Sequence, residues 1–135
     1  MKTLTLQTGQ KAEVVNVTQQ LAEMVAGVQD GLAFFSTPHT TAALFVCEDD
    51  DELRADLIHV AQDLFANLRP FKHVRNNNPN AEAHLMSAML GTSLVIAVEN
   101  GKLQLGSYQN ILFLELDGPK LREIRCRVVH IGPFS

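Results

Sequence analysis

Three of the five histidines stand where a metal ion or a small anion could be bound. His39 follows Pro38 between two strand-like segments, His73 lies in a polar stretch, and His84 lies one turn into a short helical segment that begins at Asn80. Neutral imidazole is a common ligand of Zn²⁺, and three such ligands leave a fourth position for water or substrate. The spacings of 34 and 11 residues match no rigid local motif. Histidines that are separately solvated or singly hydrogen-bonded are the competing interpretation.

Other polar side chains near these histidines could take part in the same chemistry. Thr40 and Thr41 directly follow His39 and could hydrogen-bond an anion, although threonine is also a good strand residue. Glu48 closes the same strand and could act as a general base or orient a ligand imidazole; the alternative is a solvated carboxylate in the first turn of a helix. Arg127 shares one face of the last strand with a second arginine and could bind phosphate, unless both are simply solvated.

The composition bounds the class of protein. The chain has 135 residues, 46% hydrophobic and 19% charged, which suits one domain spanning residues 1–135 with a real core. A net charge of −4 gives little support for nucleic-acid binding, and no apolar run approaches the ~20 residues that span a bilayer. The N-terminus lacks the apolar stretch of a signal peptide, so a cytoplasmic, soluble protein is expected. Cys47 and Cys126 lie in apolar runs and are predicted to be buried thiols.

The elements that would position these residues follow from the hydrophobic period. Alternation predicts a hairpin of strands over residues 2–8 and 11–17, then a helix with Thr18 as N-cap and Gly31 as its stop. Strands are predicted on both sides of Pro38 and His39. The acidic run 48–52 leads into a second helix reaching Leu68.

The second half is predicted to be rich in strands. Residues 69–80 form a polar loop, a short helix runs from Asn80 to Leu90, and Gly91 ends it. Four further strands are expected at residues 93–99, 102–106, 110–116 and 123–130, with an Asn100–Gly101 turn after the first. In the last of them Ile124, Cys126 and Val128 face the core, and Arg125 and Arg127 face solvent or a ligand. This order of elements predicts an α+β fold of two packed, mostly antiparallel sheets, with about three helices on one side.

Beyond these general patterns, an ordered set of short segments resembles the YjbQ family, an uncharacterised protein family also known as secondary thiamine-phosphate synthase. The resemblance covers nearly the whole chain. It is carried by His39-Thr40-Thr41-Ala42, Phe71-Lys72-His73, Ala83-His84-Leu85, Leu90-Gly91, Glu99-Asn100-Gly101-Lys102-Leu103, Leu105-Gly106 with Gln109, and Asp117-Gly118-Pro119.

The resemblance implies a β-sandwich core, a homotrimer, and a site near the subunit interfaces that holds a divalent metal, often zinc, close to an anion. The family's histidines fall on His39, His73 and His84, and its acidic residue falls on Glu48. His39 and Glu48 are then the candidate catalytic residues, and Thr40, Thr41 and Arg127 the candidate substrate-binding ones. The chain departs from the family in the acidic run that follows Glu48, which should disfavour a polyanionic ligand.

Three functions are compatible with these features. The first is a metal-assisted enzyme that acts on a small phosphorylated molecule. The family resemblance implies the joining of a pyrimidine diphosphate to a thiazole phosphate with loss of pyrophosphate, as a main or a side activity. The second is a metal-dependent hydrolase with Glu48 as the base. The third is a non-catalytic trimer that binds a metal or an anion.

Overall fold

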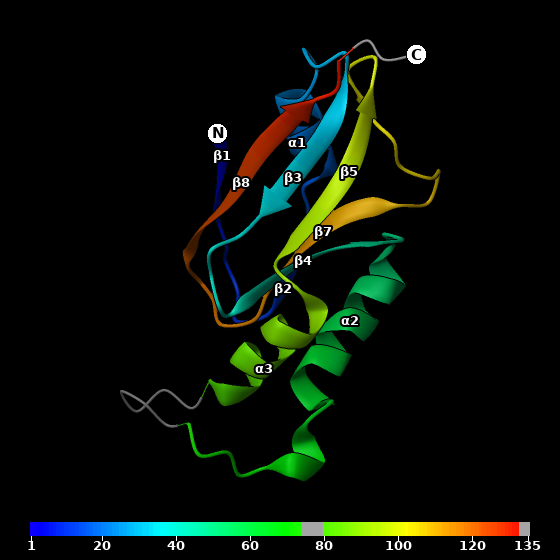
Figure 1. Cartoon of the computed structure of the whole chain (residues 1–135). Coiled ribbons are helices and arrows are strands. Elements are labelled where there is room, and N and C mark those ends of the chain that lie inside the picture. The colour runs from blue at the N-terminus through cyan, green and yellow to red at the C-terminus, as the bar shows by residue number, and fades with distance from the viewer. Residues whose placement is uncertain (74–79, 133–135) are drawn as a thin grey trace.

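Two antiparallel sheets lie face to face and form the body of the molecule (Figure 1). The computed structural model describes residues 1–73 and 80–132. The five-stranded sheet has the order β1 (Lys2–Gln7), β8 (Leu121–His130), β3 (Asp30–Ser36), β5 (Ser93–Glu99), β6 (Lys102–Leu103). The three-stranded sheet has the order β2 (Glu13–Asn16), β7 (Asn110–Glu115), β4 (Ala42–Cys47). The predicted α+β fold with two packed antiparallel sheets is confirmed.

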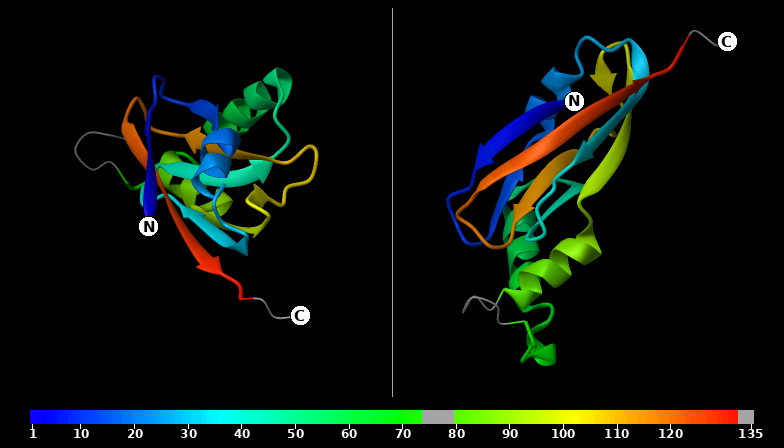
Figure 2. Two further views of the ribbon diagram at one scale, coloured as in Figure 1. Left: turned by 90° about the horizontal axis from the view of Figure 1, so that it is seen from above. Right: turned by 60° about the vertical axis from the view of Figure 1, so that its left-hand side comes forward.

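The helices cover the three-stranded sheet and one end of the sandwich. α2 (Asp51–Asp63) and α3 (Ala81–Leu90) pack on the outer face of that sheet, through a cluster that includes Leu112, Leu114 and Met86. α1 (Thr18–Met24) contributes Leu21 to the main core between the sheets. The right-hand view of Figure 2 shows α1 at the end of the molecule away from α2 and α3. No helix among the described residues is long and apolar enough to cross a membrane.

The last strand has the predicted register. Ile124 and Cys126 are buried in the main core, Val128 is half-buried, and Arg127 is exposed. Both cysteines are free thiols; Cys126 is buried and Cys47 half-buried. Period-2 alternation predicts this well because the five-stranded sheet buries only one of its faces.

The predicted N-terminal hairpin is wrong. β1 pairs with β8 in one sheet, whereas β2 pairs with β7 in the other. Residues 8–12 carry the chain from one sheet to the other instead of turning it back. Alternation shows which face of a strand is buried but not which strand lies beside it, so two consecutive strands were expected to pair when they do not.

The first helix is shorter than predicted and is capped differently. It ends at Met24, and Gly31 lies inside β3. Thr18 is the first helical residue rather than the N-cap; its Oγ1 donates to Asn16 Oδ1 at 2.6 Å and accepts from Ile111 N at 2.8 Å. The hydroxyl therefore links the helix to the neighbouring strand.

The other helix ends and the hairpin turn agree more closely with the sequence. Asp50 caps α2 by accepting from Leu53 N at 2.8 Å, although α2 ends at Asp63 and only a short 3₁₀ turn, η1 (Ala66–Leu68), follows. Gly91 ends α3 with φ = 99°. Asn100 and Gly101 both have positive φ, as the predicted turn between β5 and β6 requires. Residues 74–79 of the predicted loop lie outside the described residues.

Three crossings between the sheets meet at one end of the sandwich. They are residues 8–12, 37–41 and 116–120, and we call them the crossover cluster. Backbone hydrogen bonds join them, from Thr8 N to Lys120 O (3.0 Å), Gly118 N to Lys11 O (3.0 Å) and Leu116 N to Thr41 O (3.1 Å). The predicted His39 and Thr41 lie in this cluster, so the fold brings part of the candidate site to that end.

Candidate functional site

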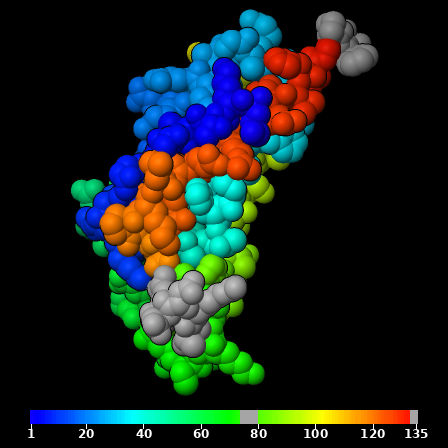
Figure 3. Space-filling view, turned by 90° about the vertical axis from the view of Figure 1, so that its left-hand side faces the viewer, coloured from blue at the N-terminus to red at the C-terminus, as the bar shows by residue number. Residues whose placement is uncertain are grey.

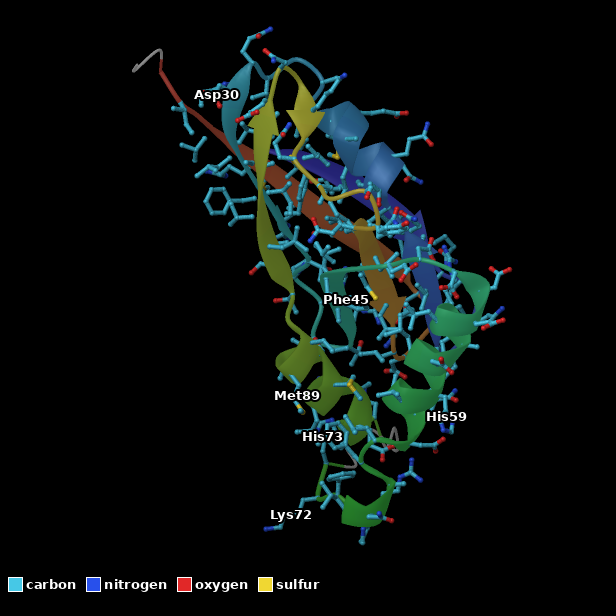
Figure 4. All side chains as sticks on the ribbon, turned by 90° about the vertical axis from the view of Figure 1, so that its right-hand side faces the viewer. Asp30, Phe45, His59, Lys72, His73 and Met89 are labelled. Carbon is cyan, nitrogen blue, oxygen red and sulfur yellow. The ribbon has the colours of Figure 1, made fainter. Side chains whose placement is uncertain are left out.

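Two of the predicted histidines lie side by side next to α3. The ring centroids of His73 and His84 are 5.1 Å apart and the rings meet edge to face at 82°. They line a cavity of about 340 Å³ together with Lys72, two apolar neighbours from α3 and Phe71. Figure 4 shows His73 and Lys72 at this end of the molecule, with Asp30 at the opposite end. The cavity therefore combines two imidazoles, one cation and an apolar wall.

A chain of hydrogen bonds leads from this pair to the crossover cluster. His73 Nε2 lies 3.0 Å from Asn80 Oδ1. The Nδ2 atom of the same amide donates to Asp117 Oδ2 at 3.0 Å. Asn80 was expected to cap α3, but its side chain makes no capping bond because both ends of the amide are engaged elsewhere.

Asp117 is held as an anion by several donors. Lys11 Nζ lies 3.0 Å from Oδ1 and Lys120 Nζ lies 2.9 Å from Oδ2. Burial alone would raise the pKa of Asp117, but hydrogen bonds from Asn80, Lys120 and Lys11 hold it well below its usual range. Asp117 is therefore an ionised, largely buried anchor for Asn80.

His39 is engaged elsewhere in the crossover cluster. Its Nε2 accepts a hydrogen bond from Glu123 N at 3.1 Å. Burial of the ring, with a smaller effect from the nearby Arg122 guanidinium, lowers the pKa of His39 below its ordinary value. The ring is therefore neutral near pH 7 with its proton on Nδ1, and in this geometry its Nε2 is a hydrogen-bond acceptor rather than an open metal ligand.

The three predicted histidines do not form a metal centre within one chain. Over residues 1–73 and 80–132, no group of three or more His, Cys, Asp or Glu side chains is arranged to hold a metal ion. His73 and His84 come together, but the Nε2 of His39 is occupied by the backbone of β8. One chain thus supplies two adjacent imidazoles in place of the expected three.

Glu48 is also not where the prediction needs it. His39 precedes the first residue of β4 and Glu48 follows its last, so the six residues of that strand separate them. At about 3.3 Å per residue the strand is roughly 20 Å long. Glu48 is exposed at the far end of the strand, so within one chain it does not reach His39.

The remaining predicted anion-binding residues have different environments. Thr41 is buried at 5% exposure, and its Oγ1 and carbonyl oxygen accept from Arg122 Nη2 at 2.8 and 3.1 Å, so its hydroxyl lies against the Arg122 side chain rather than at the surface where an anion would bind. Thr40 is exposed beside His39. Arg127 is exposed and lines a separate cavity of about 760 Å³ near α1 and the N-terminus. Thr40 and Arg127 therefore remain possible ligands for an anion, but they belong to other surfaces than the His73–His84 cavity.

A buried ion pair beside the crossover cluster, between Glu115 of β7 and Arg122 of β8, was not predicted from the sequence. Glu115 is fully buried; its oxygens accept from Thr8 Oγ1 at 2.6 Å, from the backbone N–H groups of Leu116 and Asp117 at 3.0 and 3.1 Å, and from Arg122 Nε at 2.8 Å. Arg122 Nη2 makes a second bond to the same carboxylate. Burial would raise the pKa of Glu115, but the bonds from Arg122, Thr8 and the backbone keep it below its ordinary value.

A signal for this pair was present in the sequence. Arg122 lies two residues before Ile124, and therefore on the core-facing side of β8. An arginine at a core position requires a buried carboxylate. Glu115, which follows four consecutive apolar residues of β7, was the natural partner.

Comparisons with known proteins give a consistent result. A family model described as "UPF0047 protein YjbQ-like" matches residues 2–131. The chain is 42% identical over 121 residues to a UPF0047 protein of Archaeoglobus fulgidus, covering 90% of this chain and 94% of the relative. It is 32% identical over 137 residues to UPF0047 protein YugU of Bacillus subtilis, covering 98% and 99%.

Solved structures share the fold. A YbjQ-like protein of unknown function from Sulfolobus solfataricus superimposes with a TM-score of 0.90 at 31% identity, over 96% of each chain. The conserved hypothetical protein TT1486 from Thermus thermophilus gives a TM-score of 0.84 at 32% identity, over 96% of this chain and 100% of that one.

Proposed function

This chain belongs to the UPF0047 YjbQ-like family, and we propose from its own side chains that it is a metal-dependent enzyme acting on a small phosphorylated substrate. The observation that carries the proposal is the edge-to-face pair of His73 and His84 in a cavity that Lys72 also lines. Imidazole nitrogens suit zinc, and a lysine ammonium suits phosphate oxygens. Together these groups can bind a divalent ion and the phosphate of a small substrate.

The described residues fit part of a metal site. His73 and His84 would hold the ion, whereas a catalytic zinc site takes three protein ligands. In a homotrimer, which the family resemblance implies, a second copy could supply the third. When bound, the ion would supply positive charge to a departing pyrophosphate. In this arrangement Lys72 binds phosphate oxygens, and Phe71 and Leu85 form the apolar wall of the cavity.

Of the other two functions, the hydrolase is less well supported, and the non-catalytic trimer can be distinguished from an enzyme only by assay. The hydrolase required Glu48 as the base, and Glu48 lies at the far end of β4 from His39. The non-catalytic trimer would use the same two imidazoles, so only turnover distinguishes it from an enzyme. Formation of thiamine phosphate with release of pyrophosphate is the specific reaction proposed, either as the main reaction or as a side activity of an enzyme for a related phosphate.

Product analysis on the purified protein tests this proposal. With a pyrimidine diphosphate and a thiazole phosphate, we expect pyrophosphate release that a chelator removes and added Zn²⁺ restores. Lys72→Ala should raise KM more than it lowers kcat, because Lys72 binds phosphate in the ground state and the transition state alike. Bound metal without turnover would favour the non-catalytic trimer. Protein that neither contains nor takes up a divalent metal would contradict the proposal.

The outer face of the five-stranded sheet supports self-association. Phe34, Val95 and Val129 are 42%, 49% and 49% exposed. Phe34 is opposite Val95 on β5 and Arg127 on β8, so these side chains share that face. Figure 3 shows β1, β8 and β3 side by side on one face of the molecule. Closed cyclic assembly would cover apolar surface of this kind.

We predict that light scattering gives about three times the 14.9 kDa mass of one chain. Val95→Asp should shift the mass toward that of the single chain, because Val95 lies opposite Phe34 and a carboxylate there would have to be buried at the apolar interface. Val60→Asp is the matched control, since Val60 is 47% exposed but lies on α2. A wild-type mass near 14.9 kDa would refute the homotrimer.

A further inference from the structure

We infer that Asn80, anchored by Asp117, is a positioning residue for the histidine pair: it holds neutral His73 as the Nε2–H tautomer and leaves Nδ1 as the only open nitrogen of that ring. The inference rests on the proposed role of His73 and His84 as the functional pair. It concerns the contact of Asn80 with His73, which is required neither by the proposed reaction nor by the choice of His73 and His84 as metal ligands.

The first step is the orientation of the Asn80 amide. One end of the amide lies 3.0 Å from Asp117 Oδ2. An ionised carboxylate only accepts hydrogen bonds, so the amide must present Nδ2 to it. The carboxylate is itself fixed, because Lys11 and Lys120 bind its two oxygens and its side chain is only 6% exposed. A flipped amide would bring Oδ1 against the carboxylate oxygen, and two acceptors cannot share a hydrogen bond, so the amide keeps Nδ2 toward Asp117.

The second step is the tautomer of His73. Since Nδ2 faces Asp117, Oδ1 faces the imidazole, 3.0 Å from Nε2. An amide oxygen only accepts, so Nε2 must carry the hydrogen. A neutral imidazole has one N–H, and Nδ1 is left with a lone pair. This is the arrangement of metal-binding histidines whose second nitrogen donates to an oxygen.

The third step links Asn80 to the other histidine. His84 N donates to Asn80 O at 3.3 Å in the first turn of α3. The same residue thus contacts His73 through its side chain and His84 through its main chain. Asn80 also forgoes the side-chain cap that its position at the start of the helix would allow. These contacts make it the connection between the crossover cluster and the pair.

Two measurements on the full-length chain test this inference. In ring-¹⁵N-labelled protein, at a pH where His73 is neutral, we expect a pyrrole-type Nε2 and a pyridine-type Nδ1. In Asn80→Ala the two resonances should move toward each other as the tautomers exchange. Titration with Co²⁺ should show a dissociation constant about 10–100-fold higher for Asn80→Ala than for the wild type. This is the usual loss of affinity when the oxygen partner of a ligand histidine is removed.

Asn67→Ala is the matched control, because Asn67 is exposed in η1 and does not line the His73–His84 cavity. It should leave both the ring resonances and the Co²⁺ affinity unchanged. The wild-type spectrum decides the tautomer even if Asn80→Ala fails to fold: a proton on Nδ1 of His73 would overturn the inference.

The outcomes separate the inference from the proposed function. Co²⁺ binding that is unchanged in a folded Asn80→Ala, with unchanged ring resonances, would overturn the positioning role while leaving the histidine pair as a metal site. A wild-type protein that shows the Nε2–H tautomer, altered in Asn80→Ala, but binds no Co²⁺ would support the positioning role and contradict the proposed metal site.

Discussion

Arg122→Met is expected to destabilise the protein by about 3–5 kcal/mol, because it leaves the Glu115 carboxylate buried without its cation. The side chains of Arg122 and Glu115 are 3% and 0% exposed, so water cannot replace the lost partner. Arg122 also donates to the Thr41 hydroxyl and carbonyl, which would lose their donor. Urea denaturation followed by circular dichroism gives the free energy of unfolding.

Arg125→Met is the matched control on the same strand. Arg125 pairs with Glu123 at 2.7 Å, but both side chains are more than a third exposed, so the change should cost no more than about 1 kcal/mol. Adding Glu115→Leu to Arg122→Met should recover part of the loss by removing the stranded charge. Equal effects of Arg122→Met and Arg125→Met would show that the buried pair has no special role.

His84→Ala is expected to abolish stoichiometric metal binding and leave the fold intact. His84 supplies one of the two adjacent imidazoles, and a single remaining histidine binds a divalent ion weakly. The ring is half-buried at the cavity rather than in the core, so stability should change little. Elemental analysis of the purified variant, with a thermal melt beside it, measures both effects.

His59→Ala controls for the loss of a histidine as such. His59 is on α2, its side chain is 75% exposed, and it pairs with Asp63 at 3.1 Å (Figure 4). It should retain the full metal content of the wild type. Metal retained by His84→Ala and by His73→Ala would contradict the proposed centre.

The fold was predictable wherever a strand or helix buries one face and exposes the other, because that sets the spacing of its apolar residues. The alternation in β8 predicted Ile124 and Cys126 as buried, and the acidic run predicted the start of α2. The partners of β1 and β2 were not predictable, because local alternation is compatible with any neighbouring strand. Three of the crossings between the sheets meet in the crossover cluster, and nothing in the composition of residues 8–12 distinguishes a crossing from a tight turn.

The candidate site was predictable only in part. The choice of histidines as candidate ligands correctly predicted that His73 and His84 lie together. It also included His39, whose Nε2 accepts a hydrogen bond from the backbone of β8. Sequence spacing could not separate them because the contacts are set by packing across the sandwich. Asn80 was interpreted as a helix cap, its ordinary local role, and its bonds to residues far along the chain could not be foreseen.

The pairing of β1 with β8 also has a consequence for biosynthesis. Lys2 lies opposite Cys126 and Gln7 opposite Leu121, so the first strand to leave the ribosome has the last strand as its partner (Figure 2). At about 5–20 residues per second, β1 waits several seconds or more for that partner. The larger sheet therefore cannot close until residues 121–130 have been made. Its closure joins segments more than 110 residues apart in the chain, and such non-local pairing makes folding slow.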